Sequence, residues 1–426
     1  MYAWVVTYAV LILTKPDIMR DILTSPCCTN KSVLYKPLHK VGKGLLSSND
    51  PEWSVHRKHL NPAFSFNILQ SFIPIFNEEV NKVVQTFKDI NECADVINLM
   101  QDLTLNETLR TTMGVNLAHD FENGANIDLI KSYQCMTKNV TQMLLSPWLT
   151  NDLIRRLWGI YEPFHSCKEE NHKFIKKLIS NKLKRDDDAA IMMMQRESKN
   201  SNIFIDQAIE LMRKNIFTVK HVEDESGTII LAAIETSANT IGNVFILMAM
   251  FPEYQHRVYE ELLTIFPDGG DFDVTYANIQ DMTYLDMVIN ESMRILTQIP
   301  FVARENSQDI ELSNGMVIPA GVQLFLNIFT MHRRKDLCGP RADMFDPDHF
   351  LPSNMEGKHP FAFIPFTKGI RNCIGWKYGL MSTKVTLAKL LRNFKFSTDF
   401  QYADLEFSFS IVLKLKHIPV LRIKNR

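Results

Sequence analysis

The sequence predicts a mainly α-helical protein with a smaller β region. Apolar residues recur with helical spacing from position 17 to about position 300, and short strand-like runs separated by turn residues follow Arg304. Residues 227–250 form an apolar run that is long enough for one helix through the centre of the fold. No internal repeat, low-complexity tract or linker divides the chain of 426 residues.

The composition is that of a globular protein without a nucleic-acid partner. Hydrophobic residues make up 46% of the chain, which is enough to bury a core and excludes an intrinsically disordered protein. There are 47 Lys and Arg residues against 48 Asp and Glu residues, whereas a nucleic-acid binder usually carries a basic excess. The seven cysteines are scattered without a CxxC pair, so the sequence predicts neither a zinc site nor a disulfide framework.

The first element is an apolar run at residues 1–14 that is rich in Val, Ile, Tyr and Thr. It is shorter than the roughly 20 residues of a membrane-spanning helix, and it lacks the basic region and cleavage site of a signal peptide. Followed by Lys15-Pro16-Asp17, this run predicts a buried strand that leads into a helix. The sequence as written predicts no membrane anchor.

Helices account for most of the next part of the chain. Asp50 can cap a helix whose first turn contains Pro51, where the missing N–H costs nothing. The polar segments 184–188 and 195–202 predict a mobile surface connection. Further helices are expected at residues 100–113, 127–145 and 151–184.

The apolar run at residues 227–250 is long enough to span a membrane, and Pro252 ends it. Glu235, Asn239 and Asn243 lie four residues apart and form one polar stripe on this helix. Because a carboxylate at the centre of a bilayer is costly, we favour a helix through the protein core whose polar face lines a wet cavity.

The sharpest local pattern is FTKGIRNCIG at residues 366–375, of the form F-x-x-G-x-R-x-C-x-G. It resembles the haem-binding loop of the cytochrome P450 superfamily. The resemblance makes five residues candidates for binding haem, with the cysteine as the axial ligand of the iron: Phe366, Gly369, Arg371, Cys373 and Gly375.

The chemistry of these residue types agrees with that resemblance. A thiolate such as that of Cys373 is a soft, strongly donating axial ligand, and the amides of the helix expected at residues 374–393 would stabilise it. Gly369 permits a tight turn, and Gly375 permits close packing beneath the ring. Arg371 can pair with a haem propionate.

Two further motifs resemble haem-contacting and structural segments of the same superfamily. Trp53 and Arg57 match W-x-x-x-R and share a helical face, from which both can address a propionate. Arg304 resembles another propionate ligand. Glu291 and Arg294 match E-x-x-R, which places an ion pair on one helical face.

His349 occupies the position where the superfamily often has an arginine that completes a triad with the E-x-x-R pair. We expect a structural triad of Glu291, Arg294 and His349, in which the histidine is a weaker and pH-dependent partner.

The segment AAIETS at residues 232–237 resembles [AG]-G-x-[DE]-T-[TS]. A hydroxyl beside a carboxylate at the centre of a helix can hold a water there, so Glu235 and Thr236 are the candidate catalytic residues that relay protons to dioxygen. Some relatives attach haem covalently through a Glu at the position that Ala232 occupies here. Because alanine has no carboxylate for such a bond, we expect haem b that is bound non-covalently.

The chain is similar to the microsomal clan that includes fatty-acid ω-hydroxylases, and insect members look closest. The resemblance implies the cytochrome P450 fold, with haem between the long central helix and the helix after the cysteine loop. It also implies one catalytic domain over residues 1–426, N-terminally truncated so that it lacks the usual membrane anchor, hinge, first helix and first strand.

The same resemblance implies a haem-thiolate monooxygenase. Such an enzyme inserts one oxygen atom from O2 into a lipophilic substrate, such as a fatty acid, an insect hormone or a xenobiotic, including insecticides. Its electrons come from NADPH through a cytochrome reductase, or from a cytochrome b-type donor, at the cytoplasmic face of the endoplasmic reticulum membrane. Two alternatives stay open: an inactive haem-binding fragment, and a haem-thiolate isomerase or dehydratase, against which Glu235 and Thr236 argue.

Two contact surfaces are expected on such an enzyme. A basic patch near the cysteine would speed encounter with an acidic redox partner, and its candidates are His56, Lys58, Lys368 and Lys377. An apolar pocket would hold the substrate, and its candidates are Leu231, Ile234, Ile299, Phe301, Val302 and Ile411.

Overall fold

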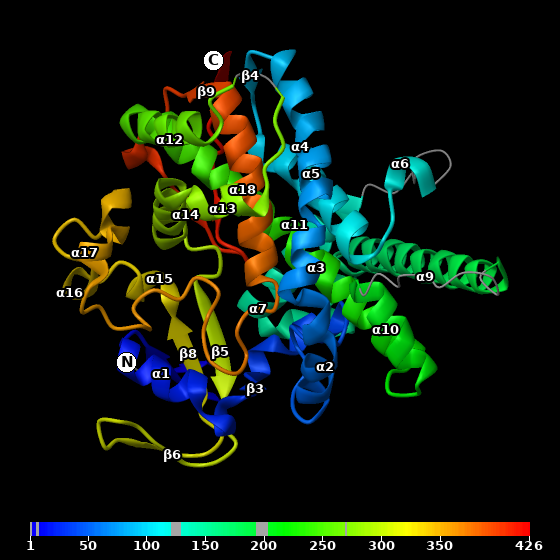
Figure 1. Ribbon diagram of the computed structural model, residues 1–426. Helices are drawn as coiled ribbons and strands as arrows, with labels where there is room; N and C mark the ends of the chain where they lie inside the picture. Colours follow the sequence, from blue (N-terminus) through cyan, green and yellow to red (C-terminus); the bar gives the residue numbers. More distant parts are fainter. Residues whose placement is uncertain (1, 6–7, 121–128, 193–202, 269–270) are drawn as a thin grey trace. The chain divides into compact units, whose positions relative to one another are not determined.

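The computed structural model describes residues 2–5, 8–120, 129–192, 203–268 and 271–426 (Figure 1). These residues are mainly helical and include four small sheets, so the predicted fold class is confirmed. The chain forms two compact units, which are described in turn. Unit 1 comprises Met1–Val33, Ile73–Leu103 and Glu235–Arg426, and unit 2 comprises Leu34–Phe72 and Thr104–Ile234.

The largest sheet belongs to unit 1 and has the strand order β1-β2-β8-β5-β3. β2 and β8 are parallel, and the other neighbouring pairs are antiparallel. The N-terminal run thus forms two antiparallel strands, so the prediction of a single strand was wrong. The strands are β1 (Tyr2–Val5), β2 (Tyr8–Leu13), β3 (Asn30–Lys31), β5 (Phe301–Glu305) and β8 (Gln323–Asn327).

One apolar cluster joins this sheet to the helix that follows it. Met19, Ile22 and Leu23 of α1 (Pro16–Thr24) are buried against alternate residues of β8, Leu324 and Leu326. Alternation is expected because successive side chains of a strand point to opposite faces of its sheet. The cluster fixes the C-terminal end of α1, which contacts the cysteine loop described below.

In unit 1, α18 (Trp376–Asn393) lies beside α4 (Ile73–Lys88) and α12 (Pro252–Ile265) (Figure 1). α18 is the helix expected at residues 374–393, and most of its residues are buried. The remaining short helices are α13 (Tyr276–Asp281), α14 (Thr283–Ile295), α15 (Ile328–Met331), α16 (Lys335–Cys338) and α17 (Pro352–Met355).

Three small antiparallel sheets complete unit 1. Two are hairpins, and the third has the order β4-β12-β9. Their strands are β4 (Glu92–Cys93), β6 (Ile310–Glu311), β7 (Val317–Ile318), β9 (Phe394–Ser397), β10 (Phe407–Ser408), β11 (Lys414–Leu415) and β12 (Leu421–Asn425).

Unit 2 has helices and no strand among its described residues. The predicted helix at 151–184 is interrupted near Gly159, whose φ of +70° lies in the left-handed region. The helix after it includes residues 184–188, so this part of the predicted connection is helical, and the other part, residues 195–202, lies outside the described residues. The helices are α2 (Glu52–Leu60), α3 (Phe66–Ser71), α6 (Leu117–Asp120), α7 (Leu129–Leu145), α8 (Asp152–Leu157), α9 (Tyr161–Met192) and α10 (Phe204–Arg213).

The start of α2 lies where the sequence predicted it. The structure places Pro51, rather than Asp50, at the N-cap position. Two helices, α5 (Val96–Thr112) and α11 (Val219–Met250), contain a boundary between the units.

α11 is the long helix predicted at residues 227–250. Its 32 residues correspond to about 48 Å. It begins eight residues before the predicted start, because the prediction followed the apolar run and the first two turns of the helix are polar. In the described part of the chain it alone is long and apolar enough to cross a membrane, yet 72% of its most apolar window is buried in the structure. Glu235, Asn239 and Asn243 are all at least nine-tenths buried. This burial is what a core helix requires.

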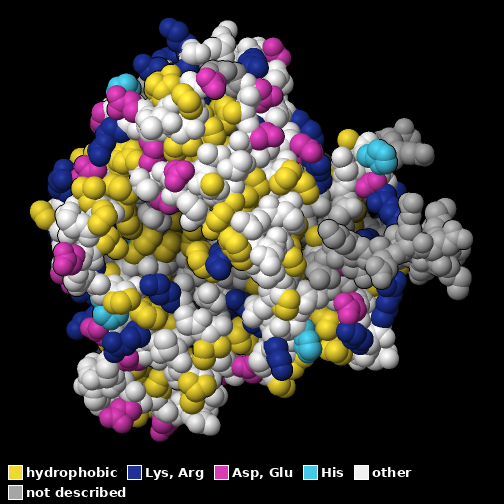
Figure 2. Space-filling model, in the orientation of Figure 1, with side chains coloured by type: hydrophobic (Ala, Val, Ile, Leu, Met, Phe, Trp, Pro, Cys, Tyr) yellow, Lys and Arg dark blue, Asp and Glu magenta, His cyan; other side chains and the backbone are white. Residues whose placement is uncertain are grey.

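Charged side chains of both signs are interspersed on the visible face of the molecule (Figure 2). This mixture agrees with the formal net charge of −1.

Candidate functional site

Cys373 lies exposed in unit 1, in a loop that precedes α18 by three residues. The N–H of Cys373 donates to the carbonyl oxygen of Phe366 at 3.0 Å, which closes the loop on itself. Thr367 has a φ of +55°, a left-handed conformation that side chains rarely adopt. The loop thus presents a thiol beside the amino end of a long helix, where the partial positive charge favours a thiolate.

Gly369 holds this loop against the end of α1. Its φ is +77°, and a Cβ at this position would lie 1.9 Å from the carbonyl oxygen of Leu23. The N–H of Ile370 donates to that same oxygen at 3.2 Å. The backbone contact therefore requires glycine at position 369.

Gly375 is different, because a Cβ there would meet no described protein atom within 4 Å. The expectation that Gly375 permits close packing finds no support in its protein contacts.

Replacing Gly369 with Ala should displace the cysteine loop, because the new methyl group cannot coexist with the Leu23 carbonyl. We expect reduced haem content and a thermal midpoint lowered by several degrees. Gly357→Ala is the matched control, since Gly357 has a φ of +73° but nothing within 4 Å of its Cβ position. Gly357→Ala should show only the modest cost of the left-handed backbone, and equal losses in both variants would contradict the role of the Leu23 contact.

Three basic side chains of unit 1 gather near this loop. Arg371, two residues before Cys373, donates to the carbonyl oxygen of Thr29 at 2.8 Å and is 9% exposed. Lys31 in β3 lies opposite Arg304 in β5, which is 2% exposed. Burial, together with the charges of Arg304 and Arg371, lowers the pKa of Lys31 well below its ordinary value.

An anion close to these groups would favour the charged form of Lys31. A thiol on one loop, with Arg371 two residues away and two further basic side chains grouped with it, is the donor set that a porphyrin with carboxylate side chains needs. The residues of unit 1 therefore fit haem.

Sequence reasoning found Arg304 and Arg371 but missed Lys31. Nothing near Lys31 in the sequence distinguishes it from a surface lysine. The antiparallel register that places it opposite Arg304 is a long-range pairing that only the folded chain reveals.

Trp53 and Arg57 belong to unit 2, where both lie on α2. Trp53 is 4% exposed and Arg57 is partly buried, and the spacing of four residues puts them on one helical face as expected. His56 between them is only 2% exposed, and its Nδ1 lies 2.7 Å from Glu225 Oε1. The prediction that His56 helps to form an exposed docking patch was therefore wrong.

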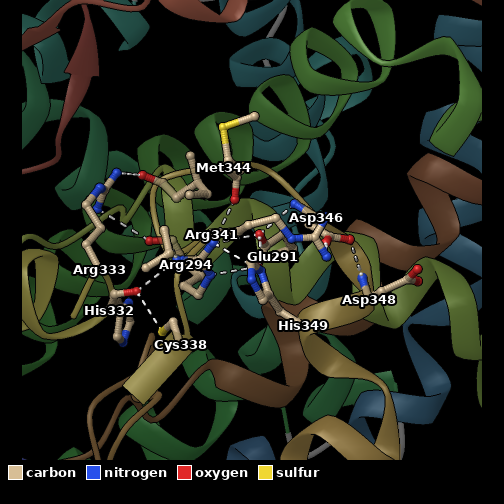
Figure 3. A network of polar contacts seen from close by, with 12 residues as sticks. Glu291, Arg294, His332, Arg333, Cys338, Arg341, Met344, Asp346, Asp348 and His349 are labelled. Atoms are coloured by element: carbon tan, nitrogen blue, oxygen red, sulfur yellow. Dashed lines mark hydrogen bonds and ion pairs between the residues drawn. The ribbon is translucent and has the colours of Figure 1, made fainter. Parts of the chain in front are cut away.

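The structure brings Glu291, Arg294 and His349 together (Figure 3). The Arg294 guanidinium forms two bonds of 2.7 Å with the Glu291 carboxylate, and both residues are almost fully buried. The remaining Arg294 donors bind three backbone carbonyl oxygens, those of His332, Ala342 and Met344, at 2.5–3.0 Å.

His349 joins this network through its Nδ1, which lies 2.9 Å from Glu291 Oε1 and 3.3 Å from the nearest Arg294 nitrogen. A carboxylate accepts hydrogen bonds and a guanidinium donates them. Since His349 Nδ1 is closer to the Glu291 carboxylate, we assign the proton to Nδ1, which donates to Glu291. Burial alone would raise the pKa of Glu291, but hydrogen bonds from Arg294 and His349 and the Arg294 charge hold it below its ordinary value.

Glu235 and Thr236 lie at the middle of α11 in the part that belongs to unit 1. The Glu235 carboxylate is 7% exposed and forms an ion pair with Lys414 of β11. One turn further along, the Thr240 hydroxyl donates to the carbonyl oxygen of Thr236 at 2.8 Å. Sequence reasoning missed Lys414, because no local pattern connects the C-terminal hairpin to the helix.

Unit 2 contains a cavity of about 310 Å³. Most of its surface is apolar, and its lining includes Leu38, Met136 and Leu231, the last of which was predicted for a substrate pocket. Charged side chains also line it, namely Lys168, Glu169, His172, Lys220, Glu223 and Asp224.

Two other candidates for the substrate pocket lie elsewhere. Val302 is part of the apolar cluster between the large sheet and α1, and Ile299 packs against that cluster. Both are core residues of unit 1, so their assignment to a pocket finds no support.

Comparison with known proteins identifies the family. The model of the family described as "Cytochrome P450" matches residues 1–420. The chain is 46% identical to "Probable cytochrome P450 313a4" of Drosophila melanogaster, over 100% of this chain and 86% of that protein. It is 39% identical to "Probable cytochrome P450 313a3" (99% and 85%) and 30% identical to "Cytochrome P450 4c3" (99% and 80%), both of the same organism. The chain therefore belongs to the cytochrome P450 family, whose members bind haem b through a cysteine thiolate, and it is a haem monooxygenase of that family.

Proposed function

We propose that Cys373 is the axial ligand of haem b and that Arg304, Arg371 and Lys31 bind the haem propionates. The observation that carries this assignment is the group of three cations in the same unit as the cysteine loop, with Arg371 two residues from the thiol. Phe366 and Gly369 shape the loop. Trp53 and Arg57 supply further propionate contacts from α2. Ala232 has no carboxylate to form an ester with haem, so the haem is held non-covalently.

When bound, the haem supplies the activation of dioxygen that permits insertion of one oxygen atom into a C–H bond. The chain's own contribution is to deliver protons at α11. Glu235, anchored by Lys414, and the hydroxyl of Thr236 form the proposed relay, since a carboxylate beside a hydroxyl can pass protons by general acid catalysis.

The proposed substrate is a lipophilic molecule, such as a fatty acid, an insect hormone or a xenobiotic, including insecticides. The cavity of unit 2 supports this class in that most of its surface is apolar.

We further propose that NADPH-derived electrons reach the enzyme through a cytochrome reductase at the cytoplasmic face of the endoplasmic reticulum membrane. Lys377 is exposed at the start of α18, four residues after Cys373, and is a candidate contact for an acidic partner. A monooxygenase consumes NADPH in proportion to product, whereas an isomerase or dehydratase forms product without it and an inactive fragment forms none.

Replacing Thr236 with Ala should uncouple the reaction. We expect NADPH consumption within about threefold of the wild type, while most of the oxygen consumed appears as hydrogen peroxide and little appears in product. The measurement is the ratio of product to NADPH and to peroxide in the reductase-reconstituted enzyme.

Thr240→Ala is the matched control for this experiment. Thr240 lies one turn further on the same helix, and its hydroxyl donates to the Thr236 carbonyl oxygen. Thr240→Ala should stay coupled. Unchanged coupling in Thr236→Ala would remove the relay from the proposal.

A further inference from the structure

Two histidines and a glutamate meet within unit 2. Glu52 and His56 lie one turn apart on α2, and His221 lies in the first turn of α11. One potential ligand atom from each lies within 4.8 Å of the other two. His221 Nε2 and Glu52 Oε1 are 3.7 Å apart, and the two imidazole rings meet edge to face at 4.7 Å.

His56 is oriented by a buried carboxylate. Its Nδ1 lies 2.7 Å from Glu225 Oε1, and because a carboxylate only accepts, Nδ1 carries a proton, which makes Nε2 the atom through which the neutral ring would bind a metal. Glu225 is itself fixed, since its second oxygen accepts from the N–H of Leu45 at 3.0 Å. Proteins usually orient a metal-binding imidazole through a carboxylate that accepts a hydrogen bond from the ring nitrogen that does not bind the metal.

The charges around this cluster also call for a cation. Glu225 is fully buried, and within the described residues neither it nor Glu52 forms an ion pair with a lysine or arginine. A buried carboxylate without a full positive charge nearby is costly. A divalent ion bound by the two histidines and Glu52 would balance both carboxylates.

We propose that Glu52, His56 and His221 bind a zinc ion in this cluster. Two imidazole nitrogens and one carboxylate suit zinc better than calcium or magnesium, which prefer oxygen ligands alone. Water takes the fourth position of the tetrahedron. The cysteine pattern of the sequence had predicted no zinc site, because these ligands come from two distant segments and none of them is a cysteine.

Binding requires modest movements of two side chains. Zinc bonds of about 2.0–2.1 Å would draw the three ligand atoms closer together than they lie now. Glu52 and His221 can make this movement, since their side chains are 33% and 30% exposed. The N–H of Thr218 lies 3.4 Å from His221 Nδ1, a long contact that is lost when the ring proton moves from Nε2 to Nδ1.

The zinc ion would join α2 to the start of α11 within unit 2. α2 also carries Trp53 and Arg57, so the ion would stabilise the helix from which the proposed propionate contacts project. Its effect on binding and on stability can be measured independently of turnover.

The test is a zinc titration of the tag-free, haem-loaded full chain against a chromophoric chelator, with melting curves recorded with and without zinc. We expect about one zinc ion per chain and a higher thermal midpoint with zinc. His221→Ala should abolish this site, and Glu225→Gln, which changes the hydrogen bond that orients His56, should weaken it roughly 10–100-fold. His417→Ala, at an exposed histidine near the C-terminus, is the matched control and should bind as the wild type does.

Two results would overturn the proposal. One is the absence of stoichiometric zinc binding by the wild type. The other is equal zinc affinity in the wild type and in His221→Ala, which would place the ion at other groups, such as surface thiols. Neither result affects the assignment of Cys373 to haem, because none of the zinc ligands belongs to the cysteine loop.

Discussion

Replacing Cys373 with Ser should abolish the thiolate signature of the haem and reduce monooxygenase turnover to background. A serine hydroxyl is a far weaker donor than a thiolate, and its much higher pKa keeps it protonated even beside the amino end of α18. The carbon-monoxide difference spectrum of the reduced protein measures the effect directly: the wild type should show the thiolate-type Soret band, and the variant should lack it.

The matched control is Cys27→Ser, which changes another cysteine of unit 1. Cys27 is half-buried, and its Sγ contacts Gln308 Oε1 at 3.6 Å, a contact that a serine hydroxyl can replace. This variant should keep the spectrum and the turnover. A Cys373→Ser protein that still bound haem with a thiolate band and oxidised substrate would show that the iron ligand is a different cysteine.

The arrangement around Cys373 could be predicted largely because its determinants are local. Gly369, Arg371 and Cys373 lie within five consecutive residues of one loop. The residues of each pair, Trp53–Arg57 and Glu291–Arg294, lie four and three residues apart on a single helix. Helical geometry brings such pairs to one face whatever the rest of the fold does. The residues that were missed are those brought in by distant segments.

Lys31 and Lys414 show why the positions of the missed residues cannot be read from a local sequence pattern. Lys31 reaches Arg304 only through the register of β3 against β5, and Lys414 reaches Glu235 only because the C-terminal hairpin lies over α11. The errors in the elements have a similar cause. Residues 1–14 contain strand-forming residues throughout, so their division into β1 and β2 depends on pairing with each other and with β8.

Replacing Arg294 with Leu should have the largest effect on stability among single changes outside the cysteine loop. It leaves the fully buried Glu291 without its cation and removes the donors of three backbone carbonyl oxygens. Breaking a buried pair in this way typically costs about 3–5 kcal/mol. Urea denaturation of the haem-loaded protein measures the loss, and Arg294→Lys, which keeps the charge but not the two-pronged geometry, should lose less.

An exposed ion pair provides the comparison. Lys214 and Glu210 are about 60% exposed and one turn apart, so Lys214→Ala should change the free energy of unfolding by no more than about 0.5 kcal/mol. Similar losses in the free energy of unfolding in Arg294→Leu and Lys214→Ala would mean that burial of the triad contributes nothing to stability.

The pH dependence gives an independent test of the same network. The folded state lowers the pKa of Glu291, so the ionised carboxylate stabilises the folded protein. This stabilisation is fully present at pH values above the unfolded-state pKa of about 4.3, and it is lost as the pH falls toward the folded-state pKa. Glu291→Gln cannot ionise, so its stability should fall less steeply with acid in this range than that of the wild type. Parallel acid limbs in the two proteins would show that the Glu291 charge does not contribute to stability, and that Arg294 acts through its bonds to the backbone alone.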